Sequence, residues 1–250
     1  MNEFPKQQSP ESPERKELTA VIQGYSEKMK NFEFFENLKK QHLSMEDYSR
    51  YFSHKYSTVG YFTDFLQDGA NIAKEGNLPH IQESFQSNYN DESGIMDSVY
   101  DKDWEHETWR QTMLKHLDVK STSENPEYSK MIQDLKSNKN IFFMSGYLTL
   151  VELFVAMEMK NIWNGMKRDL PAELTDYDKE KIPHNPLEYI QNHADHDGKH
   201  YAEIMDAVLK DMKSEEEKQE FLKGLDFGYM TRQKLYERLN EVTFTKIQND

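Results

Sequence analysis

The chain has 250 residues, enough for one large domain or two small ones with a substantial core. Its formal net charge of −14 argues against a nucleic-acid partner, because phosphate contacts need clustered Lys and Arg, and weakly against binding to an anionic membrane. The absence of cysteine excludes disulfides, thiolate metal sites and a cysteine nucleophile.

The first segment, residues 1–16, is polar, contains three prolines and lacks the apolar core of a signal peptide. We expect it to be a disordered tail ahead of one helical domain that covers residues 17–250. No run of about 18 apolar residues is evident, so the sequence predicts no membrane span. A cytoplasmic protein is the simplest expectation.

From residue 17 onward, apolar side chains recur at helical intervals of three and four, and the low content of Gly and Pro also favours helices. Ser44 is expected to cap the second helix, and Pro186 to occupy the first position of the seventh. The predicted helices cover residues 17–41, 44–73, 79–92, 104–117, 127–137, 139–167, 186–212 and 215–246. Since no stretch resembles a strand, the predicted fold class is an all-α bundle of seven or more helices in a single domain.

The segment HADHDGKH, residues 193–200, crowds three histidines and two aspartates into one helix. Successive helical side chains turn by about 100°, so His193, Asp197 and His200 share one stripe. His196 lies at the edge of that stripe and Asp195 points away from it. Two imidazoles and a carboxylate on one face suit iron, manganese or zinc. The alternative is a hydrogen-bonded surface cluster.

Two further carboxylates fall on inward helical faces. Glu152 lies in the most apolar helix, where a carboxylate is costly to desolvate unless it is paired or bound to a cation. Its other interpretation is a salt bridge to an inward Arg or Lys. Glu92 follows the apolar stripe of its helix while Asp91 points away, although an acidic pair before a glycine commonly just ends a helix in solvent.

His106, in WEHETW, lies on the face of its helix that also holds Met113 and Leu117. A lone histidine on such a face is more often a satisfied core residue than a ligand. With His106, the candidate ligands are three histidines and three carboxylates. They are Glu92, His106, Glu152, His193, Asp197 and His200. In helical bundles, carboxylates that bridge two irons with histidines to cap them recur, so the inventory fits a site for two metal ions with positions left for oxygen and substrate.

The order of these motifs is similar to that in a known superfamily. The order resembles that in the haem-oxygenase-like diiron oxidases and oxygenases, which include the chlamydial protein associating with death domains. The matching motifs, in chain order, are NYNDE, the histidine of HETW, the glutamate of GYLTLVE, and HADHDGKH. The resemblance implies the seven-helix haem-oxygenase-like fold without haem. The metal ligands that it implies are Glu92, His106, Glu152, His193, Asp197 and His200.

One departure concerns the second ligand. The gap between Glu92 and His106 is longer than is usual in this superfamily. The aspartates that lie within the gap are therefore alternative ligands: Asp97, Asp101 and Asp103.

The resemblance implies that two Fe2+ ions, with manganese as an alternative metal, activate O2 to oxidise or cleave a small organic substrate such as an amino acid or a fatty acid. It also implies a homodimer. Two alternatives stay open: a non-catalytic helical protein that binds metal or a partner, and a hydrolase with a zinc or manganese pair. Four aromatic residues are candidates for pocket walls and equally good core residues: Tyr56, Phe62, Tyr147 and Phe154.

Overall fold

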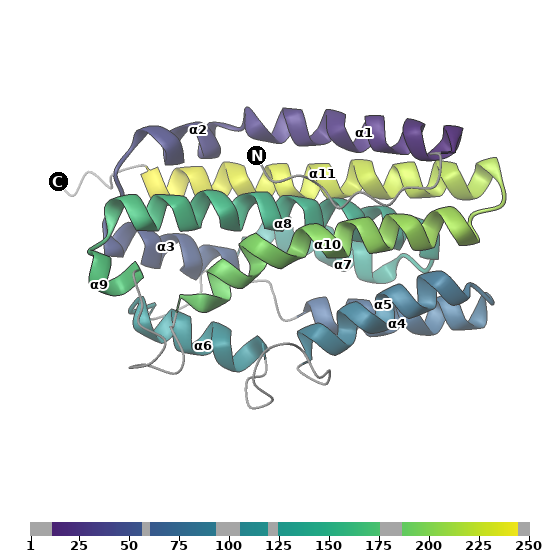
Figure 1. Cartoon of the computed structure of the whole chain (residues 1–250), viewed down its shortest axis with the longest axis horizontal. Helices are drawn as coiled ribbons and strands as arrows, with labels where there is room; N and C mark the ends of the chain where they lie inside the picture. Colours follow the sequence, from purple (N-terminus) through teal and green to yellow (C-terminus); the bar gives the residue numbers. More distant parts are fainter. Residues whose placement is uncertain (1–11, 57–60, 94–105, 120–124, 176–186, 245–250) are drawn as a thin grey trace.

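The computed structural model describes residues 12–56, 61–93, 106–119, 125–175 and 187–244, and over these residues the chain is entirely helical (Figure 1). The helices are α1 (Pro13–Lys30), α2 (Glu33–Lys40), α3 (Met45–Lys55), α4 (Phe62–Glu75), α5 (Pro79–Glu92), α6 (His106–His116), α7 (Pro126–Ser137), α8 (Ile141–Asp169), α9 (Ala172–Thr175), α10 (Glu188–Asp211) and α11 (Glu215–Phe244). The predicted all-α single domain is confirmed.

The N-terminal helices differ from the prediction in their boundaries. Helix α1 begins at Pro13, inside the expected tail, and the hydroxyl of Ser12 accepts a hydrogen bond from Arg15 N. The expected helix over residues 17–41 is interrupted because Phe32 has an extended backbone, with φ −64° and ψ 137°. Residues 1–11 lie outside the described part of the chain.

The expected helix over residues 44–73 is also two helices, α3 and α4. Ser44 caps α3 as predicted, in a capping box in which its hydroxyl accepts from Asp47 N and the Asp47 carboxylate accepts from Ser44 N. The boundary predicted at Pro186 was wrong, because α10 begins at Glu188 with Leu187 as its N-cap. Pro186 itself lies outside the described residues.

Helix α8 is the centre of the bundle. Long stretches of α10 and α11 lie alongside it, and α2 and α4 also contact it (Figure 1). Contrary to the sequence expectation, α8 is long and apolar enough to cross a membrane, but 72% of its most apolar window is buried inside the bundle. Its hydrophobic length is therefore accounted for by contacts with the neighbouring helices.

Helices α8 and α11 approach each other closely at two glycines. A Cβ atom added to Gly146 would lie 2.0 Å from the carbonyl oxygen of Phe221, and one added to Gly224 would lie 2.1 Å from that of Phe143. These distances leave no room for a methyl group. The two backbones are in direct contact here, which fixes the separation of the two longest helices.

Helices α5 and α10 are joined at one end by Asp211, the last residue of α10. One oxygen of its buried carboxylate accepts hydrogen bonds of 2.9 Å from the backbone N–H groups of His80 and Ile81, in the first turn of α5. The other oxygen lies 2.6 Å from His80 Nδ1. This contact satisfies donors that the start of a helix leaves free. It also sets the two helices antiparallel, so that the C-terminal end of α5 lies near the first half of α10.

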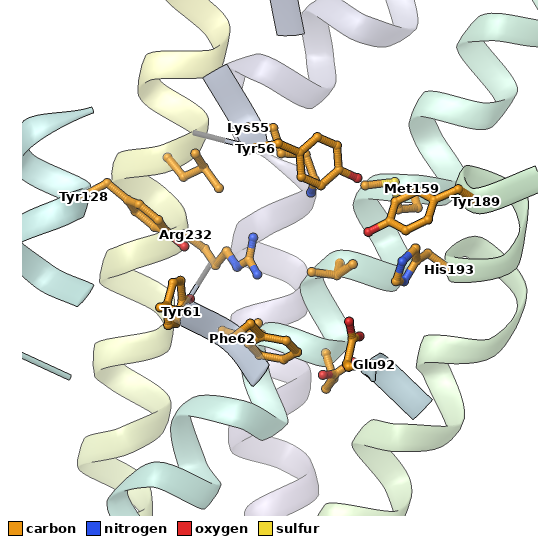
Figure 2. Close-up of a pocket in the computed structure, with 14 residues that line it drawn as sticks. Lys55, Tyr56, Tyr61, Phe62, Glu92, Tyr128, Met159, Tyr189, His193 and Arg232 are labelled. Atoms are coloured by element: carbon orange, nitrogen blue, oxygen red, sulfur yellow. The ribbon is translucent and has the colours of Figure 1, made fainter. Parts of the chain in front are cut away.

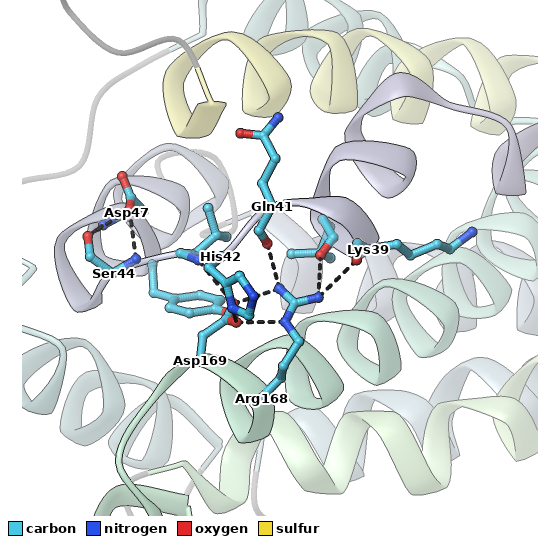
Figure 3. Close-up of polar contacts among 10 residues, drawn as sticks. Lys39, Gln41, His42, Ser44, Asp47, Arg168 and Asp169 are labelled. Atoms are coloured by element: carbon cyan, nitrogen blue, oxygen red, sulfur yellow. Dashed lines mark hydrogen bonds and ion pairs between the residues drawn. The ribbon is translucent and has the colours of Figure 1, made fainter.

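A second polar cluster fixes the C-terminal end of α8 to the segment between α2 and α3 (Figure 3). Arg168 donates to the carbonyl oxygens of Leu38, Lys39 and Gln41. The buried carboxylate of Asp169 accepts from Leu43 N and from the Tyr48 hydroxyl, and lies 2.7 Å from His42 Nδ1. These contacts hold α3 beside α8.

Candidate functional site

A cavity of about 80 Å3, partly open to solvent, lies between α8 and the helices around it (Figure 2). Aromatic and aliphatic side chains form most of its wall, and a few charged groups interrupt them. The lining residues come from α3, α4, α5, α7, α8, α10, α11 and the residue before α4, so the cavity depends on the whole bundle.

Three of the six predicted metal ligands line this cavity. Glu92 ends α5, Glu152 is buried in α8, and His193 is buried in the first half of α10. Figure 2 shows Glu92 and His193 on the same side of the cavity. Side chains from three separate helices thus line one cavity. Their role as metal ligands stays a prediction.

The ring of His193 is held by an aromatic neighbour. Tyr189, one turn earlier in α10, makes an edge-on contact with it at a centroid distance of 4.4 Å. Tyr189 also contacts the ring of Tyr56 from α3, at 6.0 Å. These ring contacts fix the orientation of the imidazole toward the cavity.

His200 lies two turns beyond His193 and is close to the end of α5. Its Nε2 atom is 3.9 Å from Oδ2 of Asp91. Its Nδ1 atom is buried and has no hydrogen-bond partner among the described residues. Asp91, which the sequence analysis directed away from the site, therefore faces α10 beside a predicted ligand. Both acidic residues at the end of α5 lie within reach of the histidine helix.

Two predicted ligands cannot be placed in the same way. The backbones of His106 and Asp197 lie in α6 and α10, but their side chains are outside the described part of the structure. The alternative ligands Asp97, Asp101 and Asp103 are outside it altogether. Among the side chains that are described, no three His, Asp or Glu groups are gathered closely enough to hold one ion.

The donor types that are present fit the group that the resemblance implies. Carboxylate oxygens and imidazole nitrogens are the ligands that non-haem iron prefers, and the buried Nδ1 of His200 is an available donor. Glu152 and His193 are buried, and Glu92 is half-buried at the end of α5.

A second charged cluster, which the sequence analysis missed, surrounds Glu158 in α8. Its carboxylate is fully buried and lies 2.7 Å from Lys55 Nζ of α3. It also accepts hydrogen bonds from the hydroxyls of Tyr51 and Tyr236, the latter at 3.1 Å. Burial alone would raise the pKa of Glu158, but the positive charges of Lys55 and Arg232 more than offset this and lower it. The carboxylate is therefore ionised.

Arg232 of α11 is the remaining charge of this cluster. Its side chain is only 8% exposed, and its closest carboxylate contact is 4.0 Å, from Nη1 to Oε2 of Glu158. Its Nε atom is buried without a hydrogen-bond partner among the described residues. Both Arg232 and Lys55 line the cavity, and Figure 2 shows the guanidinium of Arg232 pointing into it from the side opposite Glu92 and His193.

A signal for the missed residues is present in the sequence. Arg232 shares the buried stripe of α11 with Leu225, Gly228, Leu235 and Tyr236. A charge on such a stripe indicates burial, just as Glu152 did in α8. Lys55 likewise continues the stripe of Tyr48, Tyr51 and Phe52 in α3.

Of the four aromatic residues expected at the pocket, two line it. Tyr56 and Phe62 belong to the cavity wall. Tyr147 and Phe154 are fully buried in the hydrophobic core and are not among the residues that line the cavity.

The sequence matches no protein-family model and no curated protein. The structure is similar to the crystal structure, at 2.00 Å resolution, of a CADD-like protein of unknown function from Nostoc punctiforme PCC 73102. The TM-score is 0.66 and the sequence identity 13%, and the match covers 90% of this chain and 100% of the other. This chain has the CADD-like fold. The haem-oxygenase-like bundle expected from the motifs is confirmed.

Proposed function

We propose that this protein is a non-haem diiron oxidase or oxygenase, which uses O2 to oxidise or cleave a small organic substrate such as an amino acid or a fatty acid. One observation carries the proposal: Glu92, Glu152 and His193 line a single cavity of a CADD-like bundle. The superfamily with this fold includes diiron enzymes.

The residues proposed to hold the metal are Glu92, His106, Glu152, His193, Asp197 and His200. The carboxylates of Glu92 from α5 and Glu152 from α8 line the same cavity as the imidazole of His193 and would supply negative charge that offsets the charge of divalent ions. When bound, a pair of ferrous ions supplies the electrons that the activation of O2 requires. The protein contributes position, orientation and the exclusion of water.

The residues of the cavity wall are suited to orienting the proposed ligands and to surrounding them with apolar side chains. The contact with Tyr189 fixes the ring of His193, and orientation of a ligand by its neighbours affects metal affinity. Phe62, Val155 and Met159 provide apolar surface near the proposed ligands. A reactive centre in such surroundings is protected from water and from side reactions.

The test is metal analysis and O2 consumption after anaerobic loading with Fe2+. We expect about two iron ions per chain. We expect His193→Ala and Glu152→Gln each to lose most of this iron and to consume no O2. His116→Ala, at an exposed position of α6, and Glu220→Gln, at the surface of α11, are matched controls that should retain both properties.

Full iron content and O2 uptake in both site variants would contradict the assignment. A protein that takes up no metal would favour the non-catalytic alternative. Uptake of zinc or manganese without any O2 reaction would favour a hydrolase.

A further inference from the structure

The cavity has two chemically different ends. Figure 2 shows Glu92 and His193 on one side and the guanidinium of Arg232 entering from the other. Glu152 and Lys55 also line the cavity, and Lys55 lies near Arg232 because both contact the carboxylate of Glu158. Apolar side chains line the same cavity, among them Val151, Val155 and Leu235. A ligand that matches this lining has an anionic group at one end and an apolar body that extends toward the donors.

The charges at the Arg232 end do not balance. Glu158 carries one negative charge, and Lys55 at 2.7 Å is its close ion-pair partner. The hydroxyls of Tyr51 and Tyr236 also bond its two oxygens. Arg232 is a second cation, 4.0 Å away, so these three groups together carry one positive charge, while the buried carboxylate of Glu152 lines the same cavity.

Arg232 also retains unused hydrogen-bonding capacity. A guanidinium has five N–H donors in a planar fork, and a buried donor without an acceptor costs free energy. Its Nε is buried without a partner among the described residues, and the guanidinium points into the cavity. A buried guanidinium that faces a cavity with an unused N–H donor is complementary to a planar anion such as a carboxylate.

We propose that Arg232 binds the carboxylate of the substrate, so that the protein acts on an organic acid whose carbon chain lies along the apolar wall toward Glu92, Glu152 and His193. The identity of the reacting end rests on the proposed function. The anion site at Arg232 does not, because it depends only on the charges and contacts of α3, α8 and α11. A fatty acid and an amino acid both carry the required group.

The test measures ligand binding by ligand-observed NMR and by thermal shift, with and without Fe2+ under anaerobic conditions. The probes are straight-chain acids from butyrate to octanoate and their uncharged amides. Norleucine is compared with hexanoate, because the two share a chain and differ by an α-ammonium group. We expect at least one acid to bind and its amide not to bind.

We expect Arg232→Gln to weaken binding of that acid by about tenfold or more, because the variant loses at least one charge-assisted hydrogen bond to the carboxylate. Arg232→Lys keeps the charge without the fork and should retain part of the affinity. Arg238→Gln, at an exposed position of the same helix, is the matched control and should bind the acid normally.

A purely structural role for Arg232 predicts a different result. If Arg232 served mainly to neutralise Glu158, Arg232→Gln would lower the melting temperature as much as Lys55→Gln does. We expect the melting temperature of Arg232→Gln to stay near that of the unchanged protein, because Glu158 keeps its close partner. A loss equal to that of Lys55→Gln would overturn the proposal.

The proposal is also overturned if no acid binds, if the amides bind as well as the acids, or if Arg232→Gln binds the acids normally. Acid binding that depends on Arg232 in a protein that takes up no iron would refute the proposed function and leave the anion site intact. Normal iron uptake without acid binding that depends on Arg232 would refute the anion site and leave the proposed function intact.

Discussion

Asp169 shows how much one buried carboxylate contributes to this bundle. Burial alone would raise its pKa, but the Arg168 guanidinium and the donors of Leu43, His42 and Tyr48 lower the pKa to about 2, from an ordinary value of 3.8. A carboxyl with a lowered folded-state pKa stabilises the protein above its unfolded-state pKa. This stabilisation is lost as the pH falls through the folded-state value.

We expect Asp169→Asn to lower the free energy of unfolding by about 2 kcal/mol at pH 7, because each pKa unit corresponds to about 1.4 kcal/mol. The difference from the unchanged protein should shrink between about pH 4 and pH 2. Urea unfolding across this pH range measures it. Asp68→Asn, at an exposed ion pair with Lys139, is the control and should have little effect. An equal loss of stability at every pH would refute the electrostatic explanation.

Single residues were predictable where local sequence determines their role. Ser44 was identified as a cap because the capping interaction needs only a neighbour three residues away. The inward position of Glu152 followed from its apolar helix. The pairing of Glu158 with Lys55 was not predictable, because the two residues are separated by 103 positions and meet only when α3 lies against α8.

At the scale of the elements, the direct contact between the backbones of α8 and α11 leaves the least room for a larger side chain. Replacing glycine by alanine within a helix normally stabilises it by about 1 kcal/mol. At Gly224, the added methyl group would collide with backbone atoms of α8 that cannot rotate away. The helices would have to separate, and the surrounding core would lose contacts.

We therefore expect Gly224→Ala to lower the free energy of unfolding by about 2 kcal/mol or more. Gly24→Ala should instead raise it slightly, because Gly24 is exposed in α1 and a Cβ there has no neighbour within 4 Å. Denaturant unfolding of both variants distinguishes a steric cost from a general effect of alanine. A stabilised Gly224→Ala protein would show that the two helices are free to move apart.

Helix type was predicted well and helix boundaries less so. The interruption after Asn31 carries neither Pro nor Gly, and the apolar intervals continue across it from Met29 to Phe32 and Phe35. The apolar periodicity shows which side chains are buried, but it does not show where the helix axis changes direction. Beyond the interruption, Phe34 and Phe35 of α2 are buried in the core.

At the scale of the whole molecule, the proposed metal centre joins helices that are far apart in the sequence. A ligand that binds only the folded state stabilises it, by about 2.7 kcal/mol at 100 times its dissociation constant. We expect Fe2+ to raise the melting temperature and to slow amide hydrogen exchange in the first half of α10. His193→Ala should show neither change. Identical exchange with and without bound iron would refute the coupling.

The overall fold was predictable because helical periodicity covers most of the chain and the order of the ligand motifs resembles that of one superfamily. Three of the residues that the motifs pointed to, Glu92, Glu152 and His193, line one cavity, while their role in metal binding stays a prediction. The cationic end of the cavity was not, since Lys55 and Arg232 come from helices whose closeness is a property of the assembled bundle.

The fastening of α5 to α10 by Asp211 has a geometric consequence. Asp211, where the two helices are joined, is 18 residues from His193, which corresponds to about 27 Å along the helix axis at about 1.5 Å per residue. A tilt of about 2° around it would shift the imidazole by about 1 Å, well beyond the tolerance of about 0.2 Å in a coordination distance. Small angular changes far from the chemistry can thus tune the spacing between Glu92 and His193 while the remote ends of both helices stay where they are.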